Sequence, residues 1–337
     1  MSPPIAPPKI ALFANKDSNQ VAEVAAAVSA EGAVPVVLDI RVGGQAAQSD
    51  QPAVTLTDNG ARWADVDFDQ IHAIHIRCTA PRTLPTLPPV INAASHAEYR
   101  AQFIKEQAFQ ATTYAFFEHL AARGKLVANR LIHGYIEHNS KGQFYEKLRA
   151  AGFHAPRSLN TNCPEHAARF LDEVGEAVLK PTIGIGSTRV VSEDDRKRLD
   201  ELIHCPTLFQ ERLHGNTIRV HVVGDSMVLA LRIIADDIDS RTDAKDFEPI
   251  TLPEAECEAI ARANRFLGLH YAAWDAIMTP DGRLCYLDCN PGPFLLWLPL
   301  EARTQVFRHL ARYLIRFSES GSLEEASAIV CRSLASA

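Results

Sequence analysis

Three side chains that carry oxygen ligands lie in two neighbouring apolar runs near the end of the chain. Asp275 belongs to the run YAAWDAIM, while Asp288 and Asn290 belong to LCYLDCN. The segment Thr279-Pro280-Asp281-Gly282 between them has the residues of a tight turn, which predicts a β-hairpin. A two-residue loop at Asp281-Gly282, or a four-residue loop, places Asp275 opposite Asp288, whereas a three-residue loop shifts the register. Asn290 follows Asp288 by two residues and shares its face.

Two carboxylates that face each other across a ladder have Cβ atoms about 5 Å apart and repel one another. A cation between them removes this repulsion, and oxygen ligands without a nearby histidine favour Mg²⁺. Mg²⁺ binds through one or two carboxylates together with substrate phosphates, so the hairpin also predicts a nucleotide. The alternative is an exposed hairpin whose acids are solvated.

Two lysines are placed where an anion is expected. Lys180 ends the apolar run AVLK, and Lys141 begins a helical segment. A lysine within an apolar strand is costly unless it meets an anion, so Lys180 is predicted to contact phosphate. The alternative, a side chain that extends to solvent, is stronger for Lys141. Backbone N–H groups of the loop after Lys180 can close over phosphate oxygens, and this loop contains Gly184, Gly186 and Ser187.

Two arginines and one strand end complete the candidate site. Arg219 and Arg232 lie on successive predicted strands and can neutralise a transferring phosphoryl group; the alternative is a pair of structural salt bridges. The run FQERL ends a strand with alternating apolar and polar residues. A backbone amide and carbonyl there can bind an adenine edge, which makes candidates of four residues: Gln210, Glu211, Arg212 and Leu213.

The order of predicted elements indicates how these residues are positioned. Strand 9–14, helix 20–31 and strand 33–40 predict an open α/β domain with parallel pairing, closed by a long helix over 95–123. A meander over 208–233, a helix over 254–267, the hairpin and a helix over 300–318 follow. The expected divisions are an N-terminal domain 1–127, a central subdomain 128–206, a C-terminal subdomain 207–320 with the metal site, and a fraying tail 321–337.

Composition excludes several classes of function. The 337 residues carry a net charge of −7, which argues against a nucleic-acid-binding surface as the main function. No apolar run approaches the length of a membrane span, and the N-terminus lacks the layout of a signal peptide, so we expect a cytoplasmic protein that does not bind membranes. The seven cysteines are scattered without a C-x-x-C pair, which fits a reducing compartment.

The ordered series Lys141, VLKPTIGIGS, FQERLHGNTIRVHVVG and AAWDAIMTPDGRLCYLDCNPGP resembles the ATP-grasp superfamily, over roughly residues 125 to 315. Within it, the chain looks most like the RimK-like carboxylate-amine ligases. The segments NSKGQFYEKLRAAGFHAPRSLNTNCPEHAARF, IDSR and LPEAE are similar to the ligases that macrocyclise ribosomal peptides of the microviridin (graspetide) type. The resemblance implies an α/β (α+β) protein with an ATP-grasp fold behind an N-terminal open α/β pre-ATP-grasp domain.

The same resemblance implies roles for the residues named above. Lys141 and Lys180 would contact ATP phosphates, Gln210 to Leu213 would hold adenine, and Asp275, Asp288 and Asn290 would hold Mg²⁺. Arg219 and Arg232 would face the phosphate and the acyl intermediate.

The chain departs from the family's usual pattern at two of these positions and in one adjoining segment. The usual ligand Glu is Asp288, and an acidic ribose ligand is replaced by Thr217. After Asn-Pro the chain continues GPFLLW, where the peptide-cyclising ligases tend to have a Gly and an aromatic.

Three hypotheses about function follow. The first is an ATP- and Mg²⁺-dependent ligase that activates a peptide carboxylate as an acyl phosphate and joins it to an amine or hydroxyl. The second is the same chemistry on free amino acids or a small metabolite. The third is a nucleotide-binding module that has lost catalysis, for which Asp288 and Thr217 are the hints. A homodimer is left open by the sequence.

Overall fold

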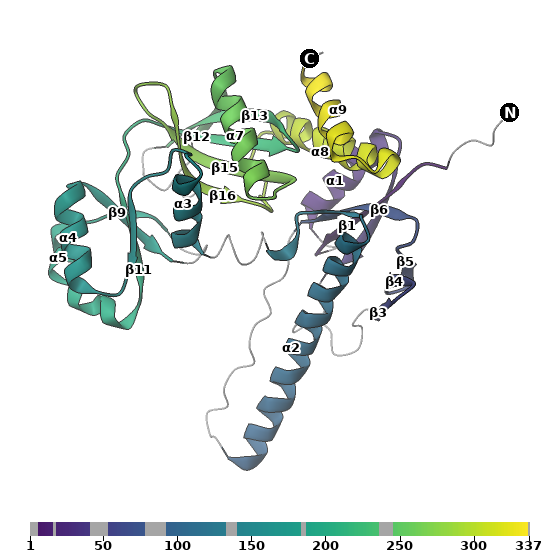
Figure 1. Cartoon of the computed structure of the whole chain (residues 1–337), viewed down its shortest axis with the longest axis horizontal. Coiled ribbons are helices and arrows are strands. Elements are labelled where there is room, and N and C mark those ends of the chain that lie inside the picture. Colours follow the sequence, from purple (N-terminus) through teal and green to yellow (C-terminus); the bar gives the residue numbers. More distant parts are fainter. Residues whose placement is uncertain are drawn as a thin grey trace. The chain divides into compact units, whose positions relative to one another are not determined.

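A computed structural model describes residues 6–15, 18–40, 53–77, 92–132, 140–182, 187–235 and 245–335. The chain divides into two compact units (Figure 1). The first unit comprises Met1–Leu131 and Phe307–Ala337, and the second comprises Ile132–Val306. The predicted glycine loop with Gly184 and Gly186, and the IDSR segment, lie outside the described residues.

The first unit contains a parallel sheet, as predicted. Its strand order is β2-β1-β6-β7, and each neighbouring pair runs parallel. Helix α1 (Asn19–Ala30) connects β1 to β2 in the strand-helix-strand order that parallel pairing requires. The strands are β1 (Lys9–Ala14), β2 (Val34–Asp39), β6 (Ile71–Ile76) and β7 (Leu126–Ala128).

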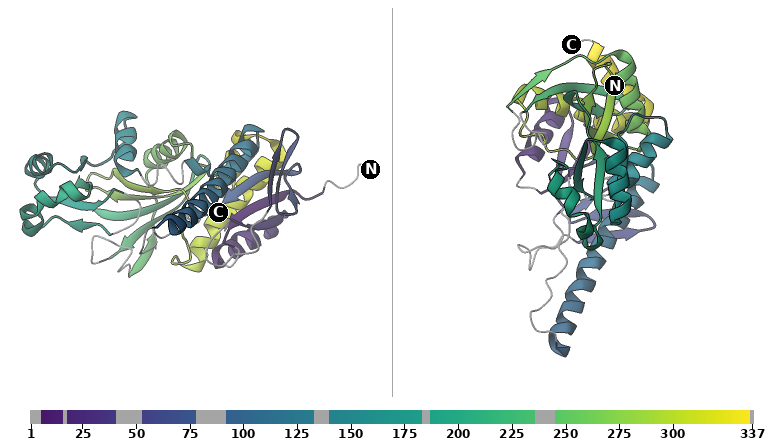
Figure 2. Two further views of the ribbon diagram at one scale, coloured as in Figure 1. Left: turned by 90° about the horizontal axis from the view of Figure 1, so that it is seen from below. Right: turned by 90° about the vertical axis from the view of Figure 1, so that its left-hand side faces the viewer.

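An aromatic cluster joins this sheet to a long helix and a small antiparallel sheet. The helix α2 (Ala93–Ala122) is continuous (Figure 2), and the small sheet is β3 (Val54–Thr57), β4 (Gly60–Trp63) and β5 (Val66–Asp67). Phe13 of β1 packs edge-on against Trp63 and Phe117, with ring centroids 5.0 and 4.8 Å apart. Burial of these rings supplies apolar contact that holds α2 against the sheet.

The tail that the sequence predicts to fray is helical. Helix α8 (Leu300–Ser320) is followed by α9 (Leu323–Ala335). Ala326 and Val330 are fully buried, and the Ser322 hydroxyl accepts a hydrogen bond from the Glu325 amide at 3.3 Å, which is the pattern of a helix N-cap. The predicted fraying is therefore wrong. The segment is rich in small and polar residues, but a few apolar residues at helical spacing are enough to give the helix a buried face.

The second unit begins with helix α3 (Lys141–Ala150) and a four-stranded antiparallel sheet in the order β10-β9-β11-β8. Its strands are β8 (Ser158–Thr161), β9 (Ala177–Pro181), β10 (Arg189–Val190) and β11 (Thr207–Glu211). Its helices are α4 (Pro164–Val174), α5 (Glu193–Lys197) and the short 3₁₀ helix η2 (Leu199–His204). Helices α4 and η2 share a core with β9 and β11 through Leu171, Leu202 and Phe209. The expected boundary at residue 207 is therefore misplaced, because β11 pairs with β8 and β9. The alternation of apolar and polar residues in β11 resembles that in β12, so the sequence does not indicate which sheet β11 joins.

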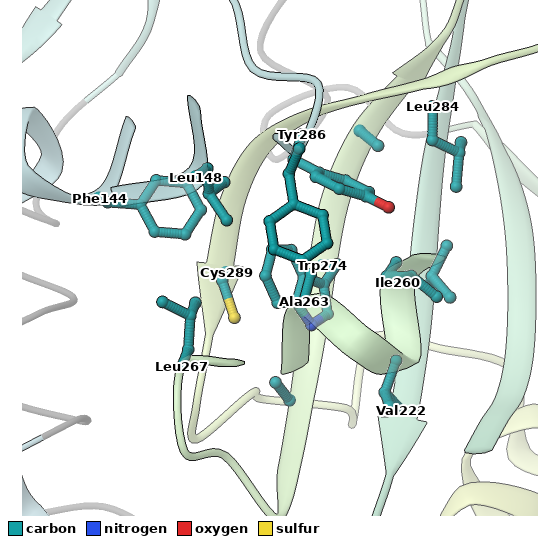
Figure 3. Packing of buried hydrophobic residues seen from close by; sticks show 14 of the residues in the cluster. Phe144, Leu148, Val222, Ile260, Ala263, Leu267, Trp274, Leu284, Tyr286 and Cys289 are labelled. Atoms are coloured by element: carbon teal, nitrogen blue, oxygen red, sulfur yellow. The ribbon is translucent and has the colours of Figure 1, made fainter. Parts of the chain in front are cut away.

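A five-stranded antiparallel sheet in the order β14-β13-β12-β15-β16 carries the predicted hairpin. Its strands are β12 (Asn216–Val223), β13 (Ser226–Ile234), β14 (Asp246–Pro249), β15 (Tyr271–Met278) and β16 (Leu284–Asn290). Trp274 packs against Tyr286, with centroids 5.2 Å apart, and helix α7 (Glu254–Phe266) contributes Ile260 and Ala263 to the same core (Figure 3). Phe144 and Leu148 extend this core to α3, so the face of the sheet that carries Trp274 is apolar, and Arg219 and Asp275 lie on the other face.

Candidate active site

The β15–β16 hairpin places Asp275 directly opposite Asp288, which confirms the predicted pairing. The loop that joins the two strands differs from both expected loops. The Thr279 amide donates to the Arg283 carbonyl at 3.0 Å, so the loop has three residues, and Ala276 pairs with Tyr286. A β-bulge at Leu287 then inserts one residue and restores the register before Asp275.

Both aspartates have a basic partner. Arg219 of β12 donates from one amino group to Asp275 Oδ1 and Oδ2 at 2.8 and 3.2 Å, and Lys141 of α3 donates to Asp288 Oδ2 at 2.6 Å. Arg219 and Lys141 are 8% and 7% exposed, so these charges are largely removed from water. Loss of hydration raises the pKa of Asp275; the Arg219 guanidinium opposes this rise, and the nearby Asp288 adds to it.

Asn290 lies on the face of these aspartates, opposite Ala273, and its Oδ1 accepts a hydrogen bond from the Gly292 amide at 3.0 Å. Two carboxylates and one amide oxygen thus gather along one end of the sheet. Within the described residues no cluster of three or more His, Cys, Asp or Glu side chains occurs. A set of two carboxylates suits Mg²⁺, which takes its remaining ligands from water and phosphate.

Lys180 also lies inside the protein, with 8% of its surface exposed. Its Nζ donates to the Tyr145 hydroxyl at 2.9 Å and lies 5.4 Å from the centre of the same ring. The Tyr145 hydroxyl in turn donates to the Leu287 carbonyl at 2.5 Å. The structure therefore brings both predicted lysines to the hairpin, Lys141 directly and Lys180 through Tyr145.

Among the buried nitrogen atoms that have no hydrogen-bond partner in the described residues are Nε2 of Gln210 and Nε of Arg219, two side chains of the predicted site. Gln210 is only 2% exposed, and a buried donor without a partner costs free energy unless a ligand or water supplies an acceptor. These donors fit a ligand rich in oxygen and nitrogen acceptors, as a nucleotide is.

The residues after Gln210 have partners of their own. Glu211 accepts from the Arg157 amide at 2.8 Å, and Arg212 lies 3.3 Å from Glu176. Leu213 follows in the connection from β11 to β12, and Ser187 is exposed at the edge of the described segment. The adenine-binding role of this segment stays a prediction.

The structure does not bring Arg232 to the aspartates. Arg232 pairs in register with Ile218 and forms an ion pair with Glu248 of β14, whereas Arg219 pairs with Leu231. Adjacent positions along a strand point to opposite faces, so Arg219 and Arg232 lie on opposite sides of the sheet. The predicted role of Arg232 in phosphoryl transfer is therefore not supported by its position.

Several residues near the site were not expected from the sequence. The Trp297 ring lies 5.0 Å from the Arg219 guanidinium carbon and 5.0 Å from the Phe247 ring. His221, on the face of Arg219, is fully buried, and neither ring nitrogen has a partner in the described part of the chain. The sequence contains a weak indication that Tyr145 belongs to the site, since it follows Lys141 by four residues and so shares its helix face.

Comparisons with known proteins identify the fold. A sequence family described as ATP-grasp domain matches residues 138–262. The chain has the ATP-grasp fold. The ATP-grasp ligase PsnB, solved with minimal precursor, Mg and ADP, superposes with a TM-score of 0.77 at 24% identity, covering 92% of this chain and 98% of that one.

Two further structures share the fold. The macrocyclase MdnC bound with precursor peptide MdnA, from Microcystis aeruginosa MRC, has a TM-score of 0.71 at 20% identity and covers 91% of this chain and 99% of its own. An ATP-grasp RimK domain protein from Sphaerobacter thermophilus DSM 20745 has a TM-score of 0.57 at 17% identity, with 91% and 99% covered. Comparison with curated protein sequences gives no significant match. In the described part of the chain, no helix is long and apolar enough to span a bilayer.

Proposed function

We propose that this chain is an ATP- and Mg²⁺-dependent ligase that activates a peptide carboxylate and joins it to an amine or hydroxyl. The observation that carries the proposal is the row Arg219, Asp275, Asp288 and Lys141 across three strands and one helix, closed by contacts of 2.6 to 3.2 Å. Such a row can bind a divalent cation and a polyphosphate side by side.

Each residue has a distinct task in this proposal. Asp275, Asp288 and Asn290 would hold Mg²⁺, which when bound withdraws charge from the phosphate oxygens. Lys141 and Lys180 would bind the phosphates as cations. Arg219 would donate to the developing charge through its Nε, which has no partner among the described residues, and the Asp275 carboxylate fixes the orientation of its guanidinium.

The reaction has two steps. A carboxylate oxygen of the substrate attacks the γ-phosphorus, which breaks the bond to ADP and gives an acyl phosphate. An amine or hydroxyl then attacks the acyl carbon, loses its proton and displaces inorganic phosphate. No side chain of the enzyme needs to form a covalent bond, and the buried setting of Arg219 and Lys180 limits the access of water to the intermediate.

A peptide is the proposed substrate because PsnB and MdnC are solved with precursor peptides and share the fold over more than nine tenths of this chain. The loss of catalysis suggested by Asp288 finds no support in the geometry. The shorter carboxylate still lies opposite Asp275 and still accepts from Lys141.

The proposal is tested by incubating the protein with ATP, Mg²⁺ and a panel of carboxylates. The panel contains short peptides rich in Asp, Glu, Ser, Thr and Lys, together with free amino acids. We expect ADP release that depends on a peptide and a product lighter than its reactants by one water. Turnover with free amino acids alone would favour the metabolite ligase. ADP release that no carboxylate stimulates would exclude both ligases.

A further inference from the structure

The Tyr145 hydroxyl joins two parts of the site. It accepts a hydrogen bond from Lys180 of β9 at 2.9 Å and donates one to Leu287 of β16 at 2.5 Å. Tyr145 itself is fully buried on α3. One phenol therefore connects the lysine that is expected to bind phosphate to the strand that carries Asp288.

The Leu287 contact falls on the bulge that sets the pairing of the aspartates. If the pairing nearer the turn continued, Leu287 would lie opposite Asp275, and Asp288 would turn to the apolar face of the sheet. A bulge interrupts the regular ladder, so its backbone groups need partners from elsewhere. The Tyr145 hydroxyl supplies a donor to the Leu287 carbonyl at this position.

We propose that Tyr145 is a positioning residue that couples Lys180 to the aspartate pair, so that its hydroxyl sets the affinity of the site for both nucleotide and Mg²⁺. This inference rests on the proposed function. Through Lys180 the hydroxyl fixes where the ammonium group meets phosphate, and through Leu287 it holds the bulge that keeps Asp288 opposite Asp275.

The hydroxyl is suited to this double task because it remains protonated. Burial raises the pKa of the Tyr145 phenol far above its ordinary value, and the charge of Asp288 adds to the rise. The group thus donates to Leu287 and accepts from Lys180 throughout the neutral range. The ring also packs 5.3 Å from Phe144, a contact that phenylalanine would keep, so the hydroxyl can be removed without removing the packing.

The test compares Tyr145→Phe with Tyr286→Phe, which removes a hydroxyl from a tyrosine only 2% exposed in the same core. Calorimetry measures ADP binding at saturating Mg²⁺, and the Mg²⁺ dependence of ADP release is measured separately. For Tyr145→Phe we expect ADP binding about tenfold weaker and the Mg²⁺ midpoint about fivefold higher, as for the loss of one charge-assisted and one neutral hydrogen bond. Tyr286→Phe should change both by less than twofold. Equal effects of the two variants would overturn the inference.

A double-mutant cycle separates this inference from the proposed function. In a Lys180→Ala background, Tyr145→Phe should no longer weaken ADP binding, because the residue through which it acts is gone. An undiminished effect would contradict the coupling, while Lys180 would keep its role. If Lys180→Ala itself left ADP binding unchanged, the proposed nucleotide site would fail instead.

Should Tyr145→Phe not fold, 3,5-difluorotyrosine at this position keeps the hydroxyl but makes it a weaker acceptor for Lys180. It should weaken ADP binding in the same direction, and unchanged binding would overturn the inference.

Discussion

Arg219 and Asp275 lie opposite each other on adjacent strands, and the guanidinium contacts both carboxylate oxygens, at 2.8 and 3.2 Å. Asp275 in turn lies opposite Asp288, which accepts from Lys141 at 2.6 Å. The two carboxylates are neighbours in this row and a basic group lies at each end, so each carboxylate is stabilised by its own cation. The two carboxylates lie opposite each other, and we propose that a divalent cation binds between them.

Asp288→Asn should lower the rate of peptide-dependent ADP release at least a hundredfold, because the metal loses one carboxylate and Lys141 loses its counter-charge. Asp288→Glu should retain activity within about tenfold, since a longer carboxylate can still bind Mg²⁺. Melting temperatures of both variants report whether the fold is intact. Equal activity of the amide and carboxylate variants would remove Asp288 from the metal site.

Arg219→Gln and Arg232→Gln form a matched pair. The first should lower kcat by a factor of about 10² to 10³, the usual cost of removing a donor to developing charge. The second should lie within about threefold of the unaltered protein, because Arg232 is on the opposite face and its pair with Glu248 is two-fifths exposed. Steady-state kinetics with ATP and a peptide measure both. A large loss in Arg232→Gln would show that this arginine reaches the substrate after all.

His221 should make the stability of the second unit depend on pH. Burial, and secondarily the charge of Arg219, lower the pKa of His221 well below its ordinary value. The unfolded chain then binds a proton below about pH 6.5 that the folded chain does not, so folded-state stability is complete above pH 6.5 and falls as the pH is lowered.

His221→Leu should remove this dependence and stabilise the protein, because it deletes two buried nitrogens that have no partner in the described residues. Between pH 7.5 and 5.5 the variant should lose about 1.4 kcal/mol less unfolding free energy than the unaltered protein. Urea unfolding at the two pH values gives both quantities. An identical loss in the two proteins would mean that His221 takes up its proton in the folded state.

Gly215 is required where β11 leads into β12. Its φ is 153°, and a Cβ there would collide with the Met278 carbonyl and approach Ile277 Cγ2 within 2.7 Å. Gly215→Ala should therefore cost roughly 3 kcal/mol or more of stability. Gly282→Ala is the control, because Gly282 has a φ of 83° but open space around it, and should cost about 1 kcal/mol. Similar costs for the two substitutions, from urea unfolding, would argue against the collision.

Local patterns in the sequence predict much of this structure. Alternation and turn residues are enough for the β15–β16 hairpin, and the apolar runs with α1 between them are enough for the parallel sheet of the first unit. Because side chains alternate along a strand, the sequence also predicts that Asn290 shares the face of Asp288. These features depend on residues close in sequence, so local rules capture them.

Local sequence patterns do not predict features that depend on residues far apart in the chain. The three-residue loop and the Leu287 bulge shift the register by compensating amounts, and nothing in LCYLDCN marks the bulge. Tyr145 meets Lys180 and Leu287 only once α3 has packed against both sheets. Arg232 and Arg219 are both predicted on successive strands, and only the pairing of β12 with β13 shows that they lie on opposite faces.

The most direct test of the account follows the oxygen of the activated carboxylate. A peptide that stimulates ADP release is prepared with both oxygens of its carboxylate as ¹⁸O, and the inorganic phosphate is analysed by mass spectrometry after turnover. Activation as an acyl phosphate predicts one ¹⁸O atom in each phosphate released, because the bridging oxygen leaves with phosphorus. Unlabelled phosphate formed together with the coupled product would contradict it.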